Sequence, residues 1–182
     1  KEMLLDKICY QIKVEIPVLK CTRFYLMKDD EIIYMAKLKY DEIFIAEGDD
    51  FHIKKKHEKN VTQIKRNTRG YNEIITDNHD FKIKYSKDGQ KFPMSVTFGY
   101  NGHKINWNPK DAEHSEFIKE GSDNIPKKSK KNFMLQNSYN LPTFILRKMS
   151  SRYYEVECFP TVDPVIVFSI ALSGIIGPIA VQ

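Results

Sequence analysis

The stretch DPVIVFSIALSGIIGP, residues 163–178, decides how this chain is expected to fold. Asp163 can cap the start of a helix, and proline suits the first helical position that Pro164 occupies. Gly177 and Pro178 end the segment, so the predicted helix is Pro164–Ile176. From Val165 to the last residue the sequence carries no charged side chain, and the helix is therefore apolar on every side.

A helix that is apolar on every side suits two environments, a bilayer and the core of a protein. A bilayer span needs about 20 apolar residues, and Gly177-Pro178 ends this helix well short of that length. No Lys or Arg follows it to anchor a far end. Since a short helix of this kind is typical of the centre of a soluble domain, we expect Pro164–Ile176 to be buried.

Short strand-like segments separated by turn residues fill most of the first 160 positions. In Phe81–Tyr85 apolar residues alternate with lysines, a period of two that indicates a strand. Asn101-Gly102 is typical of a two-residue hairpin turn. The predicted strands are Cys21–Met27, Ile32–Leu38, Ile43–Ala46, Glu73–Thr76, Phe81–Tyr85, Met94–Tyr100, Lys104–Trp107, Thr143–Leu146 and Tyr153–Cys158. This spacing of turns predicts a mainly β sandwich or barrel with largely antiparallel strands.

A single domain is expected over residues 1–182, a length that suits one domain with a sizeable core. Within it we expect an N-terminal lead-in over residues 1–20 and a polar, lysine-rich loop over 111–131. That loop is predicted to contain one short strand at Phe117–Lys119. Because the sequence begins at Lys1 rather than Met, we also expect it to be part of a longer protein.

The composition fits an intracellular, folded protein with a modest positive charge. Apolar residues make up 41% of the chain and the net charge is only +5, which argues against a disordered chain. The charge permits an anionic partner without selecting one. The three cysteines, Cys9, Cys21 and Cys158, are far apart and form no CxxC pair, so neither a disulfide framework nor a zinc site is expected. No signal-peptide pattern is present.

Motifs for catalysis or for cofactor binding are not found in the sequence. The five histidines, His52, His57, His79, His103 and His114, show no HExxH spacing and are interpreted as surface residues. A GxSxG motif and glycine-rich phosphate loops are absent, and Ser173-Gly174 is interpreted as a packing position in the helix. We therefore expect a non-catalytic protein that needs no cofactor and no metal.

Basic residues occur in clusters that suit an anionic partner. Lys37 and Lys39 alternate along one predicted strand, and like charges side by side cost stability unless an anion meets them. Further clusters are Lys54–Lys56, Lys65-Arg66 with Arg69, Lys127-Lys128 and Lys130-Lys131. Each cation near an anionic bilayer contributes about 1 kcal/mol to binding. A solvated surface and nucleic-acid binding remain alternatives, although the aromatic residues are placed for a core rather than for stacking on bases.

Several short motifs resemble the tubby protein family, in order and at similar spacing from about Cys21 to Gln182. The helix core FSIALS (168–173) resembles that family's F-A-I-x-L-S, at nearly the same distance from the terminus. Further matches are Lys131-Asn132-Phe133 with Ser129, Met94-Ser95-Val96, Ile64–Asn67 followed by Gly70, and Asp77-Asn78. The family's N-K-x-P-x-W-N and F-H-G-R-V-T segments are missing. Plant LURP-one-related or scramblase-like relatives with the same fold are the alternative.

The resemblance implies a fold and a function. The fold is a closed barrel of about twelve antiparallel strands around a central hydrophobic C-terminal helix. The function is binding of phosphatidylinositol bisphosphate headgroups at the inner leaflet of the plasma membrane, by a monomeric, cytoplasmic adaptor. Such adaptors traffic membrane cargo to cilia or take nuclear roles after a signal, so cargo or transport proteins are implied partners.

The family's headgroup contacts fall here on a partly altered set of residues. Its K-x-R pair corresponds to Gln63 and Lys65; Gln63 lacks the charge, and Lys65 lacks the two-pronged phosphate contact of Arg. Glu42 replaces an Asn and would repel an anion. The predicted phosphoinositide site consists of Gln63, Lys65, Arg66, Asn67, Lys37 and Lys39.

Three functions follow from these observations. The first is a phosphoinositide-binding membrane adaptor, for which Lys65-Arg66 at the headgroup position is the motive. The second is a nucleic-acid-binding transcriptional regulator that uses the lysine clusters. The third is a protein-interaction module that has kept the barrel and lost the lipid site, for which Glu42 and Gln63 are the motive.

Overall fold

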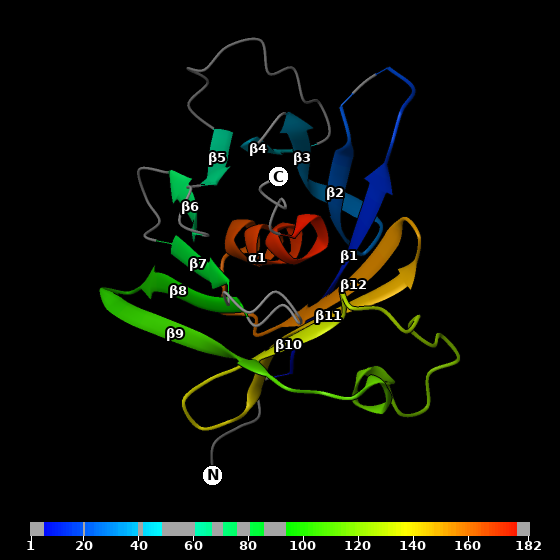
Figure 1. Ribbon diagram of the computed structural model, residues 1–182, viewed down its shortest axis with the longest axis vertical. Coiled ribbons are helices and arrows are strands. Elements are labelled where there is room, and N and C mark those ends of the chain that lie inside the picture. The colour runs from blue at the N-terminus through cyan, green and yellow to red at the C-terminus, as the bar shows by residue number, and fades with distance from the viewer. Residues whose placement is uncertain are drawn as a thin grey trace.

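The computed structural model describes residues 6–19, 21–39, 42–48, 61–66, 71–75, 81–85 and 94–177. Within these ranges the chain forms twelve strands, one 3-10 helix and one α-helix (Figure 1). They are β1 Ile8–Glu15, β2 Arg23–Lys28, β3 Glu31–Lys39, β4 Glu42–Glu47, β5 Val61–Arg66, β6 Tyr71–Ile75, β7 Phe81–Tyr85, β8 Met94–Tyr100, β9 His103–Lys110, η1 His114–Phe117, β10 Phe133–Gln136, β11 Pro142–Ser150, β12 Tyr153–Cys158 and α1 Pro164–Ile176.

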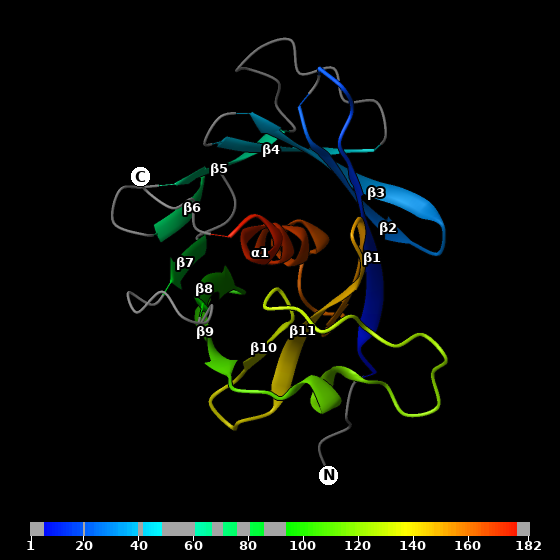
Figure 2. The ribbon, with the colours of Figure 1, turned by 45° about the vertical axis from the view of Figure 1, so that its right-hand side comes forward.

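Every strand pairs antiparallel with its neighbours in the chain, and β1 also pairs with β12. The ladder of pairings therefore closes into a barrel, and Figures 1 and 2 show α1 inside the ring. The prediction of a mainly β, antiparallel fold with one C-terminal helix is confirmed. Each of the described strands therefore has a partner on both sides, and a paired edge is protected from the edge-to-edge aggregation of β proteins.

Helix α1 is enclosed by the strands over its whole length. Its residues from Val165 to Ile175 are all buried, and each buried Val, Leu, Ile or Phe contributes about 1.5–3 kcal/mol to folding. The Asp163 carboxylate accepts a hydrogen bond from the Val165 N–H at 3.0 Å, as expected of a cap. Among the described helices none has the length and hydropathy that a membrane span requires. The expectation of a buried helix is confirmed.

The polar and glycine positions of α1 are packing positions, as the sequence predicted for Ser173-Gly174. The hydroxyls of Ser169 and Ser173 donate to carbonyls one turn earlier, at 2.6 and 2.8 Å, so neither is left unsatisfied in the core. A Cβ atom added to Gly174 would lie 2.2 Å from Cε1 of Phe133. Only glycine lets α1 approach β10 this closely.

The barrel interior is filled by alternate residues of the strands. In β7, Phe81 and Ile83 are buried while Lys82 and Lys84 are exposed, as the period of two predicts. Phe98 of β8 meets Trp107 of β9 edge to face, with ring centroids 4.9 Å apart. The hairpin turn expected at Asn101-Gly102 is present, and both residues have the positive φ angles that such a turn requires.

Two predictions about elements were wrong or incomplete, and the strands β10 and β5 were not predicted. The predicted lead-in over residues 1–20 contains β1, which closes the barrel against β12. The short strand predicted at Phe117–Lys119 is absent; η1 ends at Phe117, whose side chain packs on Met134 and Ile145 on the outer face of the barrel. Strand β10 was missed because this covering makes both of its faces apolar, so its four residues show no alternation. Strand β5 was also missed, within a polar run.

The two ends of the barrel carry different connections. Odd-numbered strands end at one rim and even-numbered strands at the other, because every neighbouring pair is antiparallel. Helix α1 follows β12 and runs back through the barrel. It ends at the rim of the odd-numbered strands, where the Lys131 ammonium donates to the Ile175 carbonyl. We name this end the helix-end rim and the opposite one the helix-start rim.

Candidate functional site

Lys37 and Lys39 lie on the outer face of β3, close to the helix-end rim. Ala36 and Leu38 contact the core, so the alternation of the strand turns the two lysines outward. Lys37 is half-buried and Lys39 is exposed. Both lysines are therefore on the outside of the barrel, as an anion-binding role requires.

Strand register relates these lysines to the residues predicted on β5. Lys39 pairs with Glu42 of β4, and Glu42 pairs with Lys65 of β5. One row further from the rim, Lys37 pairs with Phe44, and Phe44 pairs with Gln63. Four of the six predicted site residues thus occupy two neighbouring rows on one face of the sheet. The fold brings together positions more than twenty residues apart in the sequence.

The row that contains Lys39 alternates in charge across five strands. Beyond Lys65, register continues to Glu73 of β6 and then to Lys82 of β7. Opposite charges directly across a sheet stabilise each other. The expected like charges along β3 are present, since Lys37 and Lys39 share one face and Lys37 also pairs with Arg23, whereas across the sheet Lys39 meets the carboxylate-bearing Glu42. Glu42 lies between two predicted phosphate ligands, and any anion bound there must tolerate its carboxylate.

The other two residues of the predicted site are Arg66 and Asn67. Arg66 pairs with Asn72 at the end of β5, and Asn67 lies outside the described residues. The basic cluster Lys54–Lys56 and the residues His52, His57, His79 and Arg69 also lie outside them. The predicted residues on β3 and β5 are thus related by strand register.

A second basic region lies at the same rim, beside the loop that joins β9 to β10. A groove of about 600 Å³ is lined by Pro109, Lys110, Asp111, Ala112, His114, Phe117, Lys128, Ser129, Lys130, Asn132 and Phe133. This volume is typical of small-molecule sites. Its Phe walls and lysine ammonium groups could accept a molecule with an apolar body and an anionic end. In the sequence, the lysine-rich run Lys127–Lys131 indicated a basic region here. The 3-10 helix η1 and the position of Phe117 in the groove wall were not predicted.

Lys131, from the same run, has a structural role instead. Its ammonium donates to the Ile175 carbonyl at the end of α1, where a cation offsets the partial negative charge of the helix terminus. Burial, with a smaller effect of Lys148, lowers the pKa of Lys131. The lysines of this cluster are thus divided between fixing the helix and lining the groove.

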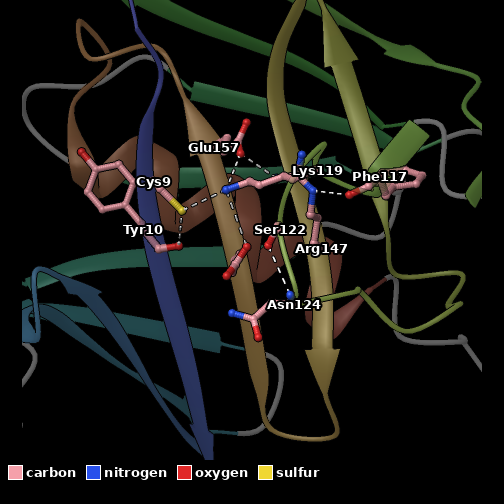
Figure 3. Close-up of polar contacts among 9 residues, drawn as sticks. Cys9, Tyr10, Phe117, Lys119, Ser122, Asn124, Arg147 and Glu157 are labelled. Atoms are coloured by element: carbon pink, nitrogen blue, oxygen red, sulfur yellow. Dashed lines mark hydrogen bonds and ion pairs between the residues drawn. The ribbon is translucent and has the colours of Figure 1, made fainter. Parts of the chain in front are cut away.

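An ion-pair network fastens the β9–β10 loop to the barrel wall (Figure 3). The Glu157 carboxylate of β12 contacts the Lys119 ammonium at 2.7 Å and the Arg147 guanidinium at 2.9 Å. Arg147 Nε also donates to the Phe117 carbonyl at 2.6 Å. Burial alone would raise the pKa of Glu157, but the two cations outweigh it and lower that pKa. The network fixes Phe117, and so one wall of the groove.

The three cysteines and two of the histidines, His103 and His114, lie among the described residues. Cys9, Cys21 and Cys158 are all free thiols. Burial raises the pKa of Cys158 to about 12, which keeps that thiol protonated. Among the described residues no group of His, Cys, Asp and Glu side chains is arranged to hold a metal ion. His103 is exposed in the β8–β9 hairpin, and His114 lines the groove with its Nδ1 buried and unbonded.

Comparison with known proteins gives no family. No protein-family model matches the chain, and no curated protein has a significantly similar sequence.

Proposed function

We propose that this chain is a non-catalytic, tubby-like domain that binds phosphoinositide headgroups at the cytoplasmic face of a membrane and serves there as an adaptor. The observation that carries the proposal is α1, buried from Val165 to Ile175 inside an antiparallel barrel. An apolar C-terminal helix threaded through such a barrel is the arrangement that the tubby resemblance implies, down to the number of strands.

The helix-end rim supports the choice of ligand. Lys37 and Lys39 present ammonium groups on the outer face, and Lys65 occupies a register position in the row of Lys39. Several cations in one place suit a headgroup that carries several phosphate charges. Glu42, between Lys39 and Lys65, opposes such a ligand. We therefore expect binding that is weak at one headgroup and sensitive to salt.

Flotation with vesicles tests the lipid ligand. Vesicles of phosphatidylcholine and phosphatidylserine are compared with and without phosphatidylinositol bisphosphate. We expect the bisphosphate lipid to increase the bound fraction, and Lys37→Ala/Lys39→Ala/Lys65→Ala to remove the increase. The matched control is Lys104→Ala, which deletes an exposed lysine at the helix-start rim. Equal flotation of all variants on both vesicles would contradict phosphoinositide recognition.

For Glu42→Asn we predict the opposite effect, a higher affinity for the bisphosphate lipid. Removing the carboxylate between Lys39 and Lys65 deletes one register partner of each lysine, and it also deletes the repulsion felt by a phosphate. We expect the affinity for bisphosphate vesicles to rise about threefold to tenfold, given the size of surface charge interactions. Titration of vesicles at low salt measures the effect, and an unchanged or lower affinity would place the headgroup elsewhere.

The alternating row of charges favours one other function. A row in which each cation faces a carboxylate is close to neutral, and such a face suits a protein partner with a complementary pattern of charges. This is the protein-interaction module that has lost the lipid site. It predicts no response to the bisphosphate lipid in the flotation experiment, and Glu42→Asn would then weaken the partner complex.

A further inference from the structure

The connection between β1 and β2 presents large apolar side chains to solvent. The exposed fractions are 56% for Ile16, 87% for Val18 and 101% for Leu19, in four consecutive apolar residues with Pro17. The connection extends beyond the barrel in Figures 1 and 2. Most other aliphatic side chains of β1 and β2 are at least partly buried. We name Ile16–Leu19 the apolar tip.

Apolar side chains this exposed indicate a surface that contacts another molecule. Aliphatic side chains gain stability when they leave water, and contiguous exposed apolar residues mark surfaces that meet a protein or a membrane. Pro17 restricts the backbone of the tip, which reduces the conformational entropy that this residue loses when the tip is buried.

The tip belongs to the same rim as the predicted headgroup residues. Glu15, the last residue of β1, pairs with Arg23, the first of β2, and Arg23 pairs with Lys37. The tip therefore begins directly after the register row that contains Lys37, at the helix-end rim. On its other side, the Val14 N–H donates to the Arg152 carbonyl at 2.9 Å, which brings the β11–β12 hairpin beside β1.

Charges around the base of the tip are mostly positive. The described cations there are Lys13, Arg23, Lys37, Lys39 and Arg152, and the described carboxylates are Glu15 and Glu42. An apolar projection set among cations complements the boundary of an anionic bilayer, where acyl chains lie below phosphate groups. A pocket on a protein partner would accommodate the tip but would not require cations from three separate hairpins.

We propose that the apolar tip, Ile16–Leu19, inserts into the headgroup–acyl boundary of an anionic membrane, with the helix-end rim facing the bilayer. The inference rests on the proposed membrane function and adds how the barrel is oriented and what anchors it. Cations at the rim bind the phosphates while Val18 and Leu19 enter the apolar layer. The two contributions add, which allows stable attachment although Glu42 weakens each headgroup contact.

Charge reversal of the tip tests its contribution. In Val18→Asp/Leu19→Asp we expect at least about a tenfold loss of affinity for phosphatidylcholine/phosphatidylserine vesicles that contain the bisphosphate lipid. Tyr139→Asp is the matched control, because Tyr139 is 79% exposed in the β10–β11 connection at the opposite rim. Since both sites are exposed, circular dichroism should show folded proteins. Wild-type affinity in the tip variant would overturn insertion.

The emission wavelength of a tryptophan placed in the tip shows whether the tip enters the apolar layer of the bilayer. Trp107, the only tryptophan of the chain, is buried and supplies a constant background. We expect emission of Leu19→Trp to shift to the blue with anionic vesicles, and emission of Tyr139→Trp to stay unchanged.

The two proposals fail in different ways. If the protein floats with bisphosphate vesicles while Leu19→Trp shows no shift, insertion is overturned and the proposed function stands. If Leu19→Trp shifts equally with and without the bisphosphate lipid, insertion stands and headgroup recognition is overturned. If the protein floats with no vesicle, both are overturned, and the tip is assigned to a protein partner.

Discussion

Gly174 shows how a single residue can fix the position of an element. A Cβ atom there would lie 2.2 Å from Cε1 of Phe133 and 2.9 Å from Cζ. Phe133 in turn stacks on Phe144, with centroids 5.5 Å apart, and has little room to retreat. The contact sets how deep α1 sits against β10, so the glycine acts through packing rather than through a special backbone angle.

Gly174→Ala should therefore destabilise the fold although alanine favours helices. We expect the free energy of unfolding to fall by about 1–3 kcal/mol, as in other overpacked cores, against a helix-propensity gain of roughly 1 kcal/mol. Urea unfolding measures the change. Combining Gly174→Ala with Phe133→Leu should recover part of the loss, because the smaller side chain frees the space; a strictly additive double variant would contradict this account.

At the scale of elements, the β9–β10 loop depends on the Glu157 network. Phe117 of η1 covers the outer face of β10 and β11, and Arg147 and Lys119 connect its loop to Glu157 of β12. Arg147 is 4% exposed, so its charge is stable there only because Glu157 is present. The loop is long and polar, and this network gives it a fixed position.

Glu157→Gln should lower stability and change its pH dependence. The pKa of Glu157 is lowered in the folded protein, so its contribution is fully present above the unfolded pKa of about 4.3 and is lost as pH falls through the folded value. We expect the wild type to lose stability in this acid range and the variant to lose less. Urea unfolding between about pH 3 and pH 7 measures both slopes. Parallel curves would show that Glu157 is not coupled to the cations.

Loss of the network should also loosen the groove. In Arg147→Met we expect faster amide hydrogen exchange at η1 than in the wild type, since Phe117 loses the hydrogen bond to its carbonyl. Lys110→Met is the comparison variant, because it removes a partly exposed ion pair with Glu116 of η1, 3.7 Å long, but keeps the hydrogen bond from Arg147 to the Phe117 carbonyl. Equal exchange at η1 in both variants would contradict a clamping role for Arg147.

At the scale of the molecule, closure of the barrel depends on β1. This strand pairs with both β2 and β12, and Ile12 at its centre is fully buried while Lys13 is exposed. Without β1 the edges of β2 and β12 would lose their partners, and unpaired edges promote aggregation. The N-terminal strand thus decides whether α1 is enclosed on all sides.

Ile12→Asp and Lys13→Asp form a matched pair for this claim. We expect Ile12→Asp to unfold or to aggregate, because a buried, unpaired carboxylate costs several kcal/mol. Lys13→Asp, one residue away on the outer face, should change stability by less than about 1 kcal/mol. Size-exclusion chromatography and thermal unfolding distinguish them. Similar behaviour of the two variants would mean that β1 is not part of the closed sheet.

What the sequence determined by itself is local. The cap at Asp163, the stop at Gly177 and the unbroken apolar run between them define α1, since helix limits depend on neighbouring residues. In the same way, the alternation of apolar residues and lysines defines β7, Phe81–Tyr85. The Asn101-Gly102 turn defines the β8–β9 hairpin. Length also mattered, because a helix too short for a bilayer had to be covered by protein.

Tertiary structure decided what depends on pairing between distant segments. Nothing local indicates that β1 meets β12, that Glu42 stands between Lys39 and Lys65, or that Glu157 joins Lys119 to Arg147. The apolar residues 16–19 looked like part of a lead-in, and only the finished barrel shows them exposed beside the cations of one rim. Burial and charge environment belong to the assembled sheet, since each strand obtains its neighbours only when the barrel closes.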